Sequence, residues 1–443
     1  MRTITTLFAL ILFSVATAQD YSDPTFVAVG RERPRSEITA YPTRESAVAT
    51  TGKSAYLQPL TWTQTNDTRG TRFTTTFTSP LAWANRQTLL RLASASHAYE
   101  VIVNDKVIGY TQNGNIPAEY NLTKASTEGI NSLVIRLIDP SAGRILESFE
   151  HPATPTLGRA EVLSQSTIRV RDLLLTTRPA DQNYVAEMGV VVKTDALNPK
   201  SARIQCELRD AAGSLVLSDF RDISLAMRGE DTLRFIAHIP QPQLWNTETP
   251  TLYNLSIKTL IEGRAAEYFD FKVGFRSVSH QEGELWVNNQ PVKLQVKKIS
   301  PTLSTDDLIV LKQEGYNTLQ LQPGVARDGF YDDCDLLGLY VIVQAPINTS
   351  GSGRSIRKGA NPSNQPKWHN AYIDRTEGSY HTTKRHPAVV AFSLAQDSAN
   401  GINLYNSYLN LKKLEAARPI LYPAAAGEWN TDKLIFDSEP SVQ

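Results

Sequence analysis

The sequence predicts a multidomain fold of class β plus α/β: a jelly-roll-like β-sandwich, an immunoglobulin-like β-sandwich and then an incomplete (β/α) barrel of the TIM type. Two patterns support this prediction. Residues 19–276 contain short segments in which apolar and polar residues alternate, and this period of two is typical of antiparallel strands. After Gly283, apolar strand segments alternate with helical segments, which indicates a parallel sheet covered by helices.

The first sandwich is expected over residues 19–162, and Asn104 and Asp105 mark one of its hairpin turns. Its clearest strand segments are TRFTTTFTSP (71–80), QTLLRLAS (87–94), AYEVIVNDKVIGYTQ (98–112) and NSLVIRLID (131–139). Residues 163–276 hold a second set of such segments, at a density that suits an immunoglobulin-like sandwich of about seven strands.

The barrel is expected over residues 277–443. Its first helix should begin with Thr305 as the cap and end at Gly315, and further helices should cover about 365–384 and 404–416. The strand segments are LQVKK (294–298), NTLQLQ (317–322), YVIVQAP (340–346), VVAFSLAQ (389–396) and PILYPAA (419–425), with LIFDS (434–438) as a candidate sixth. A barrel that stops there exposes sheet edges, so we expect self-association, a partner chain or the chain's own loops to cover it.

Residues 1–18 have the pattern of a cleaved export signal. Arg2 precedes the apolar run LFALILFSVA (7–16), which is too short to span a bilayer, and Ala16-Thr17-Ala18 offers small residues to a signal peptidase. No later segment is apolar enough to cross a membrane. We therefore expect a soluble, exported protein, periplasmic or extracellular, whose mature chain begins at Gln19.

The charge balance bears on the partner. The chain has 45 basic and 45 acidic residues and no long basic run, so nothing in it favours nucleic acid or an anionic membrane. A neutral ligand fits this composition better. Cys206 and Cys334 fall in different predicted domains, and we expect them to be buried free thiols.

Several stretches resemble glycoside hydrolase family two, its large bacterial β-galactosidases in particular. This resemblance covers nearly all of residues 20–440 and includes the order of the three domains. The similar stretches are DPTFVAVGRERPRSEITAYPTRESA (23–47), AYEVIVNDKVIGYTQNGNIPAEYNLT (98–123), LWNTETPTLYNL (244–255), VGFRSVSHQEGELWVNNQPVKL (273–294), LLGLYVIVQAP (336–346), RHPAVVAFSLAQDS (385–398) and AAGEWNTD (425–432). The resemblance implies that the first domain is a galactose-binding-like sandwich and that the substrate is a β-galactoside or another glycan.

The resemblance also locates the expected catalytic acid. Retaining hydrolysis takes two carboxylates about 5 Å apart, one as acid and one as nucleophile. The family's acid follows the fourth barrel strand in an Asn-Glu pair, and the matching positions here are Gln396 and Asp397. Asp397 is one methylene shorter than Glu, and a misplacement of about 1 Å can lower a rate 100-fold. We treat Asp397 as a degenerate acid position and Gln396 as a binding position.

Other site positions that the resemblance implies differ as well. Where the family carries His and Glu after the first strand, this chain reads VKKISP (296–301), and LQPGVA (321–326) follows the second. The third strand ends in QAPI (344–347), without the family's carboxylates. The family's nucleophilic Glu follows the seventh strand; in this chain only Glu439 could be proposed for it, and we do not favour it.

Aromatic residues could still hold a sugar, because a ring offers an apolar platform to the C–H face of a pyranose. Trp368 and Trp429 fall on the side of the barrel where loops build binding faces, so both are candidate binding residues, with packing as the alternative. We predict no metal site and no cofactor. The seven His residues are scattered without zinc-site spacing, and GSGRSIRKG (351–359) lacks the Lys-Ser/Thr ending of a phosphate loop.

These observations predict a catalytically inactive relative of the β-galactosidases that acts as an exported glycan-binding or assembly protein. The alternative is an active or weakly active glycosidase that hydrolyses the O-glycosidic bonds of β-galactosides in carbohydrate metabolism. In that case Asp397 still donates a proton, and a water molecule or a partner chain completes the pair.

Overall fold

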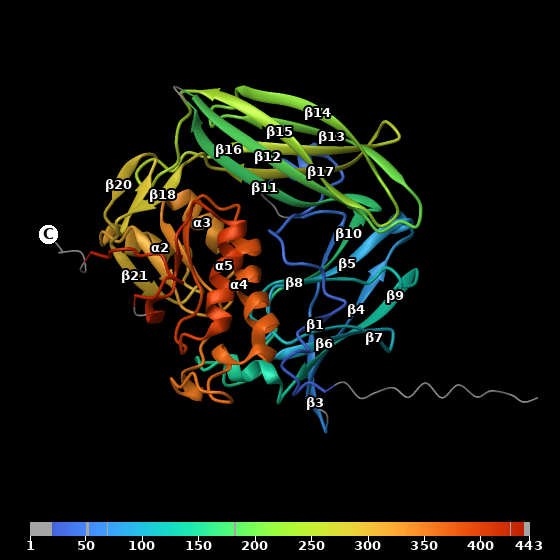
Figure 1. Cartoon of the computed structure of the whole chain (residues 1–443). Coiled ribbons are helices and arrows are strands. Elements are labelled where there is room, and N and C mark those ends of the chain that lie inside the picture. Colours follow the sequence, from blue (N-terminus) through green and yellow to red (C-terminus); the bar gives the residue numbers. More distant parts are fainter. Residues whose placement is uncertain (1–19, 50–52, 69, 181–182, 426, 438–443) are drawn as a thin grey trace, which may run out of the picture.

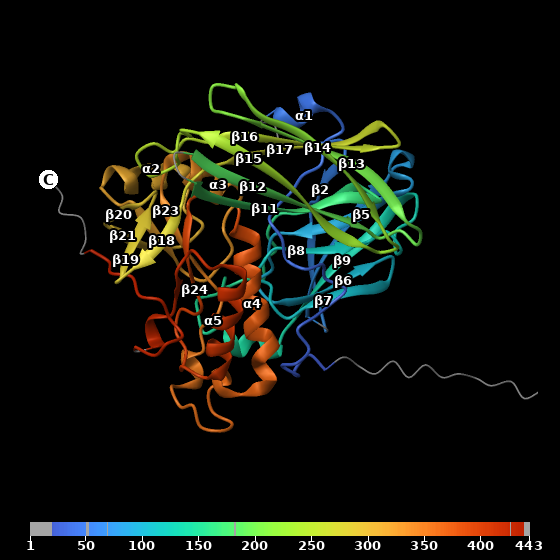
Figure 2. The same cartoon turned by 45° about the horizontal axis from the view of Figure 1, so that its top comes forward.

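The computed structural model describes residues 20–49, 53–68, 70–180, 183–425 and 427–437. Figure 1 shows a β-sandwich on the right, a second sandwich across the top and a helix-covered sheet on the left. The turned view in Figure 2 shows the same three parts next to one another. This arrangement confirms the predicted class of β plus α/β. The expected export signal (1–18) and Glu439 lie outside the described residues.

The first sandwich is built from two antiparallel sheets that enclose an apolar core. In the larger sheet the order is β1-β7-β6-β9-β4-β3, and in the smaller one it is β2-β10-β5-β8. The bounds are β1 (Ala28–Val29), α1 (Arg44–Val48), β2 (Leu57–Pro59), β3 (Thr63–Asp67), β4 (Gly70–Ser79), β5 (Arg86–Leu92), β6 (Ala98–Val103), β7 (Lys106–Thr111), β8 (Ala118–Asn121), β9 (Gly129–Ile138) and β10 (Ala160–Ser166). Asn104 and Asp105 form the β6–β7 turn with positive φ angles, as a tight hairpin requires.

The second sandwich packs a three-stranded sheet, β11-β12-β15, on a four-stranded one, β14-β13-β16-β17. All of its pairs are antiparallel, and inward apolar residues alternate with outward polar ones. The bounds are β11 (Ile168–Ala180), β12 (Asn183–Thr194), β13 (Lys200–Arg209), β14 (Leu215–Leu225), β15 (Glu230–Pro240), β16 (Tyr253–Ile261) and β17 (Arg264–Val273).

A small antiparallel sheet leads into the barrel portion, which is a five-stranded parallel sheet of order β21-β22-β23-β24-β25. The strand pairs are all parallel, so the carboxyl ends of the five strands meet on one face, and an α-helix follows each of the first four strands. The bounds are β18 (Val278–Gln281), β19 (Glu284–Val287), β20 (Gln290–Val292), β21 (Val296–Ile299), α2 (Thr305–Gln313), β22 (Thr318–Leu321), α3 (Phe330–Leu337), β23 (Tyr340–Gln344), α4 (His369–Thr383), β24 (Val389–Ser393), α5 (Ile402–Leu414) and β25 (Ile420–Leu421).

Three sequence predictions about this portion need correction. The cap of α2 is Ser304 and not Thr305. The Ser304 side chain accepts the Asp307 N–H, and the Asp307 carboxylate accepts the Ser304 N–H. The long helix starts at His369, since Pro366–Trp368 forms a 3-10 turn before it. The candidate strand at 434–438 is not formed over its described residues: Asp437 makes one isolated bridge to Gln295.

The three parts are tied together by buried polar contacts. Trp245 donates from Nε1 to the Asp335 carbonyl at 2.7 Å, and this joins the second sandwich to α3. Arg375 on α4 pairs with Glu147 of the first sandwich at 2.9 Å, with both side chains almost fully buried. Contacts of this kind are unfavourable to break, so they fix how the strand ends meet the first sandwich.

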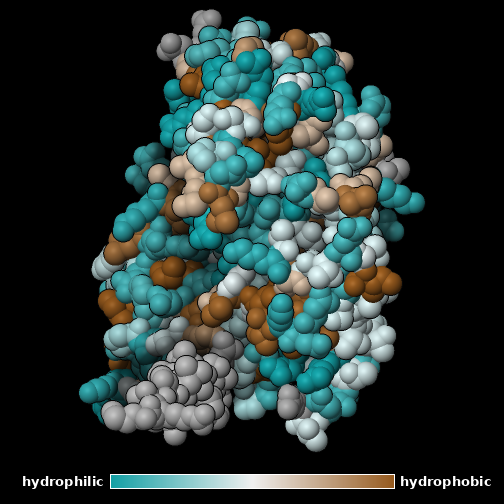
Figure 3. Space-filling model, turned by 90° about the vertical axis from the view of Figure 1, so that its right-hand side faces the viewer, coloured by the Kyte–Doolittle hydropathy of each residue, from teal (hydrophilic) through white to brown (hydrophobic). Residues whose placement is uncertain are grey.

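Two further expectations can be compared with the described residues. Cys206 and Cys334 are both buried and free, as predicted. Across the parts of the chain that the structure describes, none of the helices combines the length and apolar character that a bilayer crossing needs. Figure 3 shows a face on which hydrophilic residues predominate and hydrophobic ones form separate groups.

Candidate functional site

Asp397 lies just beyond the carboxyl end of β24, on the face where barrel enzymes place their chemistry. Its backbone carbonyl accepts the Thr349 N–H at 2.8 Å, so the loops after β23 and β24 run side by side. Its Oδ1 lies 2.7 Å from Nη2 of Arg354, and its side chain is 32% exposed. This contact is an ion pair without the alignment of a hydrogen bond. The carboxylate therefore faces a cation of its own chain.

Gln396 is exposed beside it, and its side chain is engaged by a neighbouring loop. Its Oε1 accepts from Nδ2 of Asn348 at 2.9 Å, while its backbone N–H donates to the Ile347 carbonyl. Asn348 is also bonded to the first sandwich, since its N–H donates to the Leu146 carbonyl at 2.7 Å. The first sandwich thus reaches the strand-end face.

Buried polar groups hold the Asp397 loop from below. Tyr422 donates its hydroxyl to the Ser398 carbonyl at 2.6 Å, and Thr349 shares a 2.6 Å hydrogen bond with the Ser398 hydroxyl. Burial raises the pKa of Tyr422 well above its usual value, and the nearby Tyr372 and Asp397 raise it further. The phenol therefore stays protonated and remains a donor at neutral pH.

The two predicted binding tryptophans are placed very differently. Trp368 is 3% exposed and belongs to the barrel's apolar core, so it presents no free ring. Trp429 is 57% exposed, and Tyr405 and Tyr408 pack against it edge-on with centroids at 4.9 and 6.2 Å. Next to it, Asn430 and Asn400 bond each other through their amides, which places Trp429 beside the loop that follows Asp397.

Carboxylates are scarce at the strand ends. The four residues that follow each of β21 to β25 are all described, and Asp397 is the single acidic residue among them. These segments are 300–303, 322–325, 345–348, 394–397 and 422–425. The described strand ends therefore offer one carboxylate where a two-carboxylate mechanism needs a pair.

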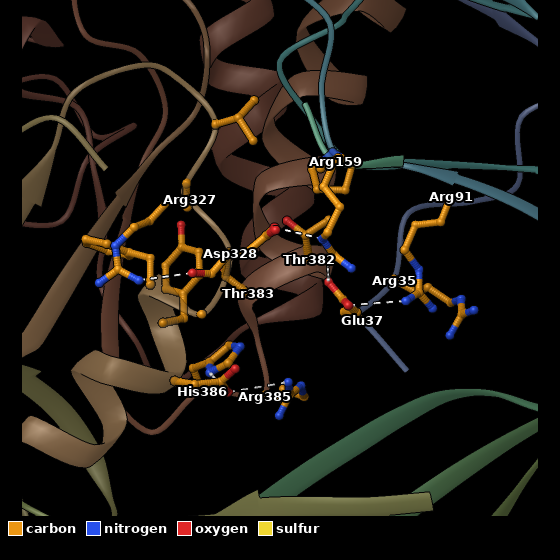
Figure 4. A pocket seen from close by; sticks show the side chains of 18 of the residues that line it. Arg35, Glu37, Arg91, Arg159, Arg327, Asp328, Thr382, Thr383, Arg385 and His386 are labelled. Carbon is orange, nitrogen blue, oxygen red and sulfur yellow. Dashed lines mark hydrogen bonds and ion pairs between the residues drawn. The ribbon is translucent and has the colours of Figure 1, made fainter. Parts of the chain in front are cut away.

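A separate cavity of about 640 Å³ lies where the two sandwiches meet α3 and α4. Figure 4 shows its centre, with Arg159, Arg35 and Arg91 around Glu37. None of the four predicted residues lines this cavity. Sequence reasoning did not find it, because its charged residues come from segments that are far apart in the chain and meet through the fold. The arm RERPRSE (31–37) was the available signal, as it places charged residues at every second position where no sheet strand forms.

The described residues contain one cluster with metal-ligand chemistry, formed by Asp332, Asp335 and His386, whose ligand atoms lie within 4.8 Å of one another. Its buried members already bond each other: the His386 Nδ1 lies 2.7 Å from Asp335 Oδ2, and Asp335 Oδ1 accepts the Ala388 N–H. Through these bonds the buried Asp335 carboxylate connects α3 to the residues just before β24.

Comparison with known families gives matches along most of the chain. Three descriptions from one family match in order: "Glycosyl hydrolases family 2, sugar binding domain" at residues 54–177, "Glycosyl hydrolases family 2" at 168–276, and "Glycosyl hydrolases family 2, TIM barrel domain" at 288–443. Their order agrees with the observed order of the two sandwiches and the parallel sheet.

Curated relatives are β-galactosidases. The protein from Priestia megaterium is 25% identical over 373 residues, which is 79% of this chain and 36% of that protein. The protein from Vibrio cholerae is 28% identical over 344 residues, or 73% of this chain and 33% of that protein. This chain thus spans about a third of the length of these relatives.

Solved structures share the fold at lower identity. The β-glucuronidase of Bacteroides uniformis superposes with a TM-score of 0.67 at 16% identity, covering 79% of this chain and 46% of that one. The β-D-glucuronidase of Dictyoglomus thermophilum gives 0.65 at 19% identity, covering 88% and 72%. The three matched domain descriptions, which together span most of residues 54–443, show that the chain belongs to family 2 of the glycosyl hydrolases.

Proposed function

We propose that this chain binds a β-galactoside or another glycan at the strand-end face without hydrolysing it. One observation carries the proposal: Asp397 is the only acidic residue among the four residues that follow each strand of the described parallel sheet, β21 to β25. The acid protonates the leaving oxygen while the nucleophile attacks the anomeric carbon, so the two roles need two groups. A single shortened carboxylate, paired with Arg354, can contact a sugar but supplies at most one of the two roles.

Binding is supported by the groups around that carboxylate. Trp429 exposes its indole while Tyr405 and Tyr408 support it from the side, which is the arrangement of a sugar platform. Gln396 and Asn400 add amide groups that donate to and accept from hydroxyls. The names of the curated relatives support a galactoside as the first ligand to test.

A weakly active glycosidase is the second candidate, because the Asp397 side chain is 32% exposed and can be reached by substrate. With one carboxylate and water as nucleophile, the product would form with inversion at the anomeric carbon. Retention of configuration would require a second catalytic group and would argue against both candidates.

Frontal affinity chromatography on immobilised lactose tests the binding proposal. We expect retention of the purified chain, and a loss of about fivefold in Trp429→Ala, since stacking on an aromatic ring contributes about 1 kcal/mol. Phe220→Ala is a matched control, because Phe220 is 51% exposed but lies on β14 of the second sandwich. Equal retention of both variants, or no retention of the parent chain, would refute the proposal.

We also propose that the chain is exported after cleavage behind Ala18, on the signal pattern of residues 1–18. Mass spectrometry of the secreted product should give a chain that starts at Gln19. Self-association remains a prediction from the sequence. Light scattering tests it, and a monodisperse monomer would contradict it.

A further inference from the structure

The cavity between the three parts has the walls of a binding site. The arm before β2, strands β5 and β10, and the second sandwich line one side, and the loop before α3, α3 itself and the end of α4 line the other. It is lined at the second strand end by Gly324 and Val325 and at the third by Gln344 and Pro346, but it reaches neither Gln396 nor Asp397. Its volume of about 640 Å³ lies within the usual range for small-molecule sites.

Its charges are paired across domain boundaries. Arg159 lies 2.7 Å from Glu37 of the arm, 2.7 Å from Glu161 of β10 and 2.8 Å from Asp328 of the barrel portion. Arg91 contacts Glu37, Glu119 and Glu161. The lining holds seven basic and seven acidic residues, so the cavity has no net charge. An ionic ligand of either sign would meet as many like charges as opposite ones.

Hydrogen-bonding capacity is left over among these pairs. Arg35 uses Nε and Nη2 for a bidentate pair with Glu119, both at 2.8 Å, and its buried Nη1 has no hydrogen-bond partner in the described chain. Arg35 is 7% exposed. The buried Nε of Arg385 is unpartnered within the same described residues. Figure 4 shows Arg35, Arg159 and Arg385 arranged around Glu37. Both nitrogens are buried, so a ligand in the cavity meets the other, paired nitrogens of these guanidinium groups and the carboxylates beside them.

Apolar surface lies beside these donors. Tyr331 packs on His386 with ring centroids at 5.3 Å, and the Asp335 carboxylate holds the imidazole through a 2.7 Å hydrogen bond. Phe271 and Phe330 also line the cavity, but they are almost fully buried, so Tyr331 is the ring that can face a ligand. A ring next to paired donors and acceptors suits a ligand with both a C–H face and hydroxyls.

We propose that this cavity is a second saccharide site, which binds a neutral sugar of one or two rings. Each sugar hydroxyl both donates and accepts, so it can bond the guanidinium groups and the carboxylates that line the cavity without adding charge. The site shares no residue with the strand-end site formed by Gln396, Asp397 and Trp429, and it does not depend on the function proposed there.

Isothermal titration of the full chain with lactose, cellobiose, maltose and xylobiose tests the proposal, with the anionic lactobionate as a comparison. We expect at least one neutral disaccharide to bind more tightly than lactobionate. Thr382→Trp, which fills the cavity from α4 without removing an ion pair, should weaken binding at least tenfold. Ala326→Phe fills it from the loop before α3 and serves if the first variant does not fold.

Glu37→Gln keeps the shape and leaves one positive charge in excess, so it should shift the preference toward lactobionate at least fivefold. Lactose can also bind the strand-end site, so Trp429→Ala should reduce that component of the lactose isotherm while the cavity component remains. Phe220→Ala lies outside both sites and should leave both components unchanged. Three results would overturn the proposal: no saturable binding by any of the four neutral sugars, binding unaffected by the folded cavity-filling variants, or no saturable binding left in Trp429→Ala.

Discussion

Arg354, on the loop between β23 and α4, places its Nη2 2.7 Å from Oδ1 of Asp397, the carboxylate that follows β24. The Arg354 side chain is 63% exposed and that of Asp397 32%, so water competes for both partners. Pairs of this kind contribute about 0–1 kcal/mol to stability. The contact therefore determines where the carboxylate points and contributes little to folding.

Arg354→Ala should accordingly lower the free energy of unfolding by no more than about 1 kcal/mol. Chemical denaturation followed by tryptophan fluorescence measures this, together with a crystal structure of the variant that locates Asp397. A loss of several kcal/mol would mean that the loop after β23 is held mainly by this pair.

The Arg375–Glu147 pair should behave differently, because its side chains are 0% and 4% exposed. Glu147→Gln leaves a buried guanidinium without its counter-charge, and breaking a buried pair typically costs about 3–5 kcal/mol. Arg203→Ala is the matched control, since its partner Asp222 and Arg203 itself are both half exposed. Equal denaturation midpoints for the two variants would contradict the role of Arg375 in joining α4 to the first sandwich.

His381 makes stability depend on pH. Burial, with a further contribution from the Lys384 charge, lowers the pKa of His381 from 6.5 to about 4. The folded chain therefore favours the neutral ring: this contribution is complete above pH 6.5 and is lost as the pH falls from there through about 4. His381→Gln should show a smaller loss of unfolding free energy than the parent over this range, measured by denaturation at fixed pH values. Identical slopes would be inconsistent with a buried neutral ring.

Gly274 marks the tight junction between the second sandwich and the barrel portion. A Cβ there would lie 2.8 Å from Cβ and Cγ of Pro387, whose ring cannot rotate away. Gly274→Ala should destabilise the chain by about 1–3 kcal/mol. Gly189→Ala is the milder control, because its nearest neighbours are Leu174 and Thr232 side-chain atoms at 3.2–3.5 Å. A larger loss of stability in Gly189→Ala than in Gly274→Ala would show that the junction moves to accommodate the added Cβ.

The sequence was sufficient to predict the strands and the fold class, because alternating and continuous apolar patterns reflect local burial. It predicted element boundaries less reliably where local signals compete. Ser304 and Thr305 are both good caps, and only the backbone decides between them. Leu434 lies in an apolar run that reads as a strand, yet it packs against the cluster of Ile342, Ala391 and Leu421.

The site was harder to predict than the fold. Trp368 and Trp429 look equivalent in the sequence, but one is core and the other exposed, and burial depends on the whole fold. The ion pair from Arg354 to Asp397 joins residues 43 positions apart through a loop without regular pattern. The cavity around Glu37 draws on all three parts, so no local motif predicts it.

Hydrolysis of p-nitrophenyl β-galactoside is the most direct test of the central claim, that the strand-end face binds sugars without cleaving them. The purified chain, Asp397→Ala and Asp397→Glu should be compared with a mock-purified sample at equal protein concentration. We predict that p-nitrophenol is released no faster by any of the three chains than by the mock sample. Turnover by the parent chain that Asp397→Ala abolishes would contradict the account.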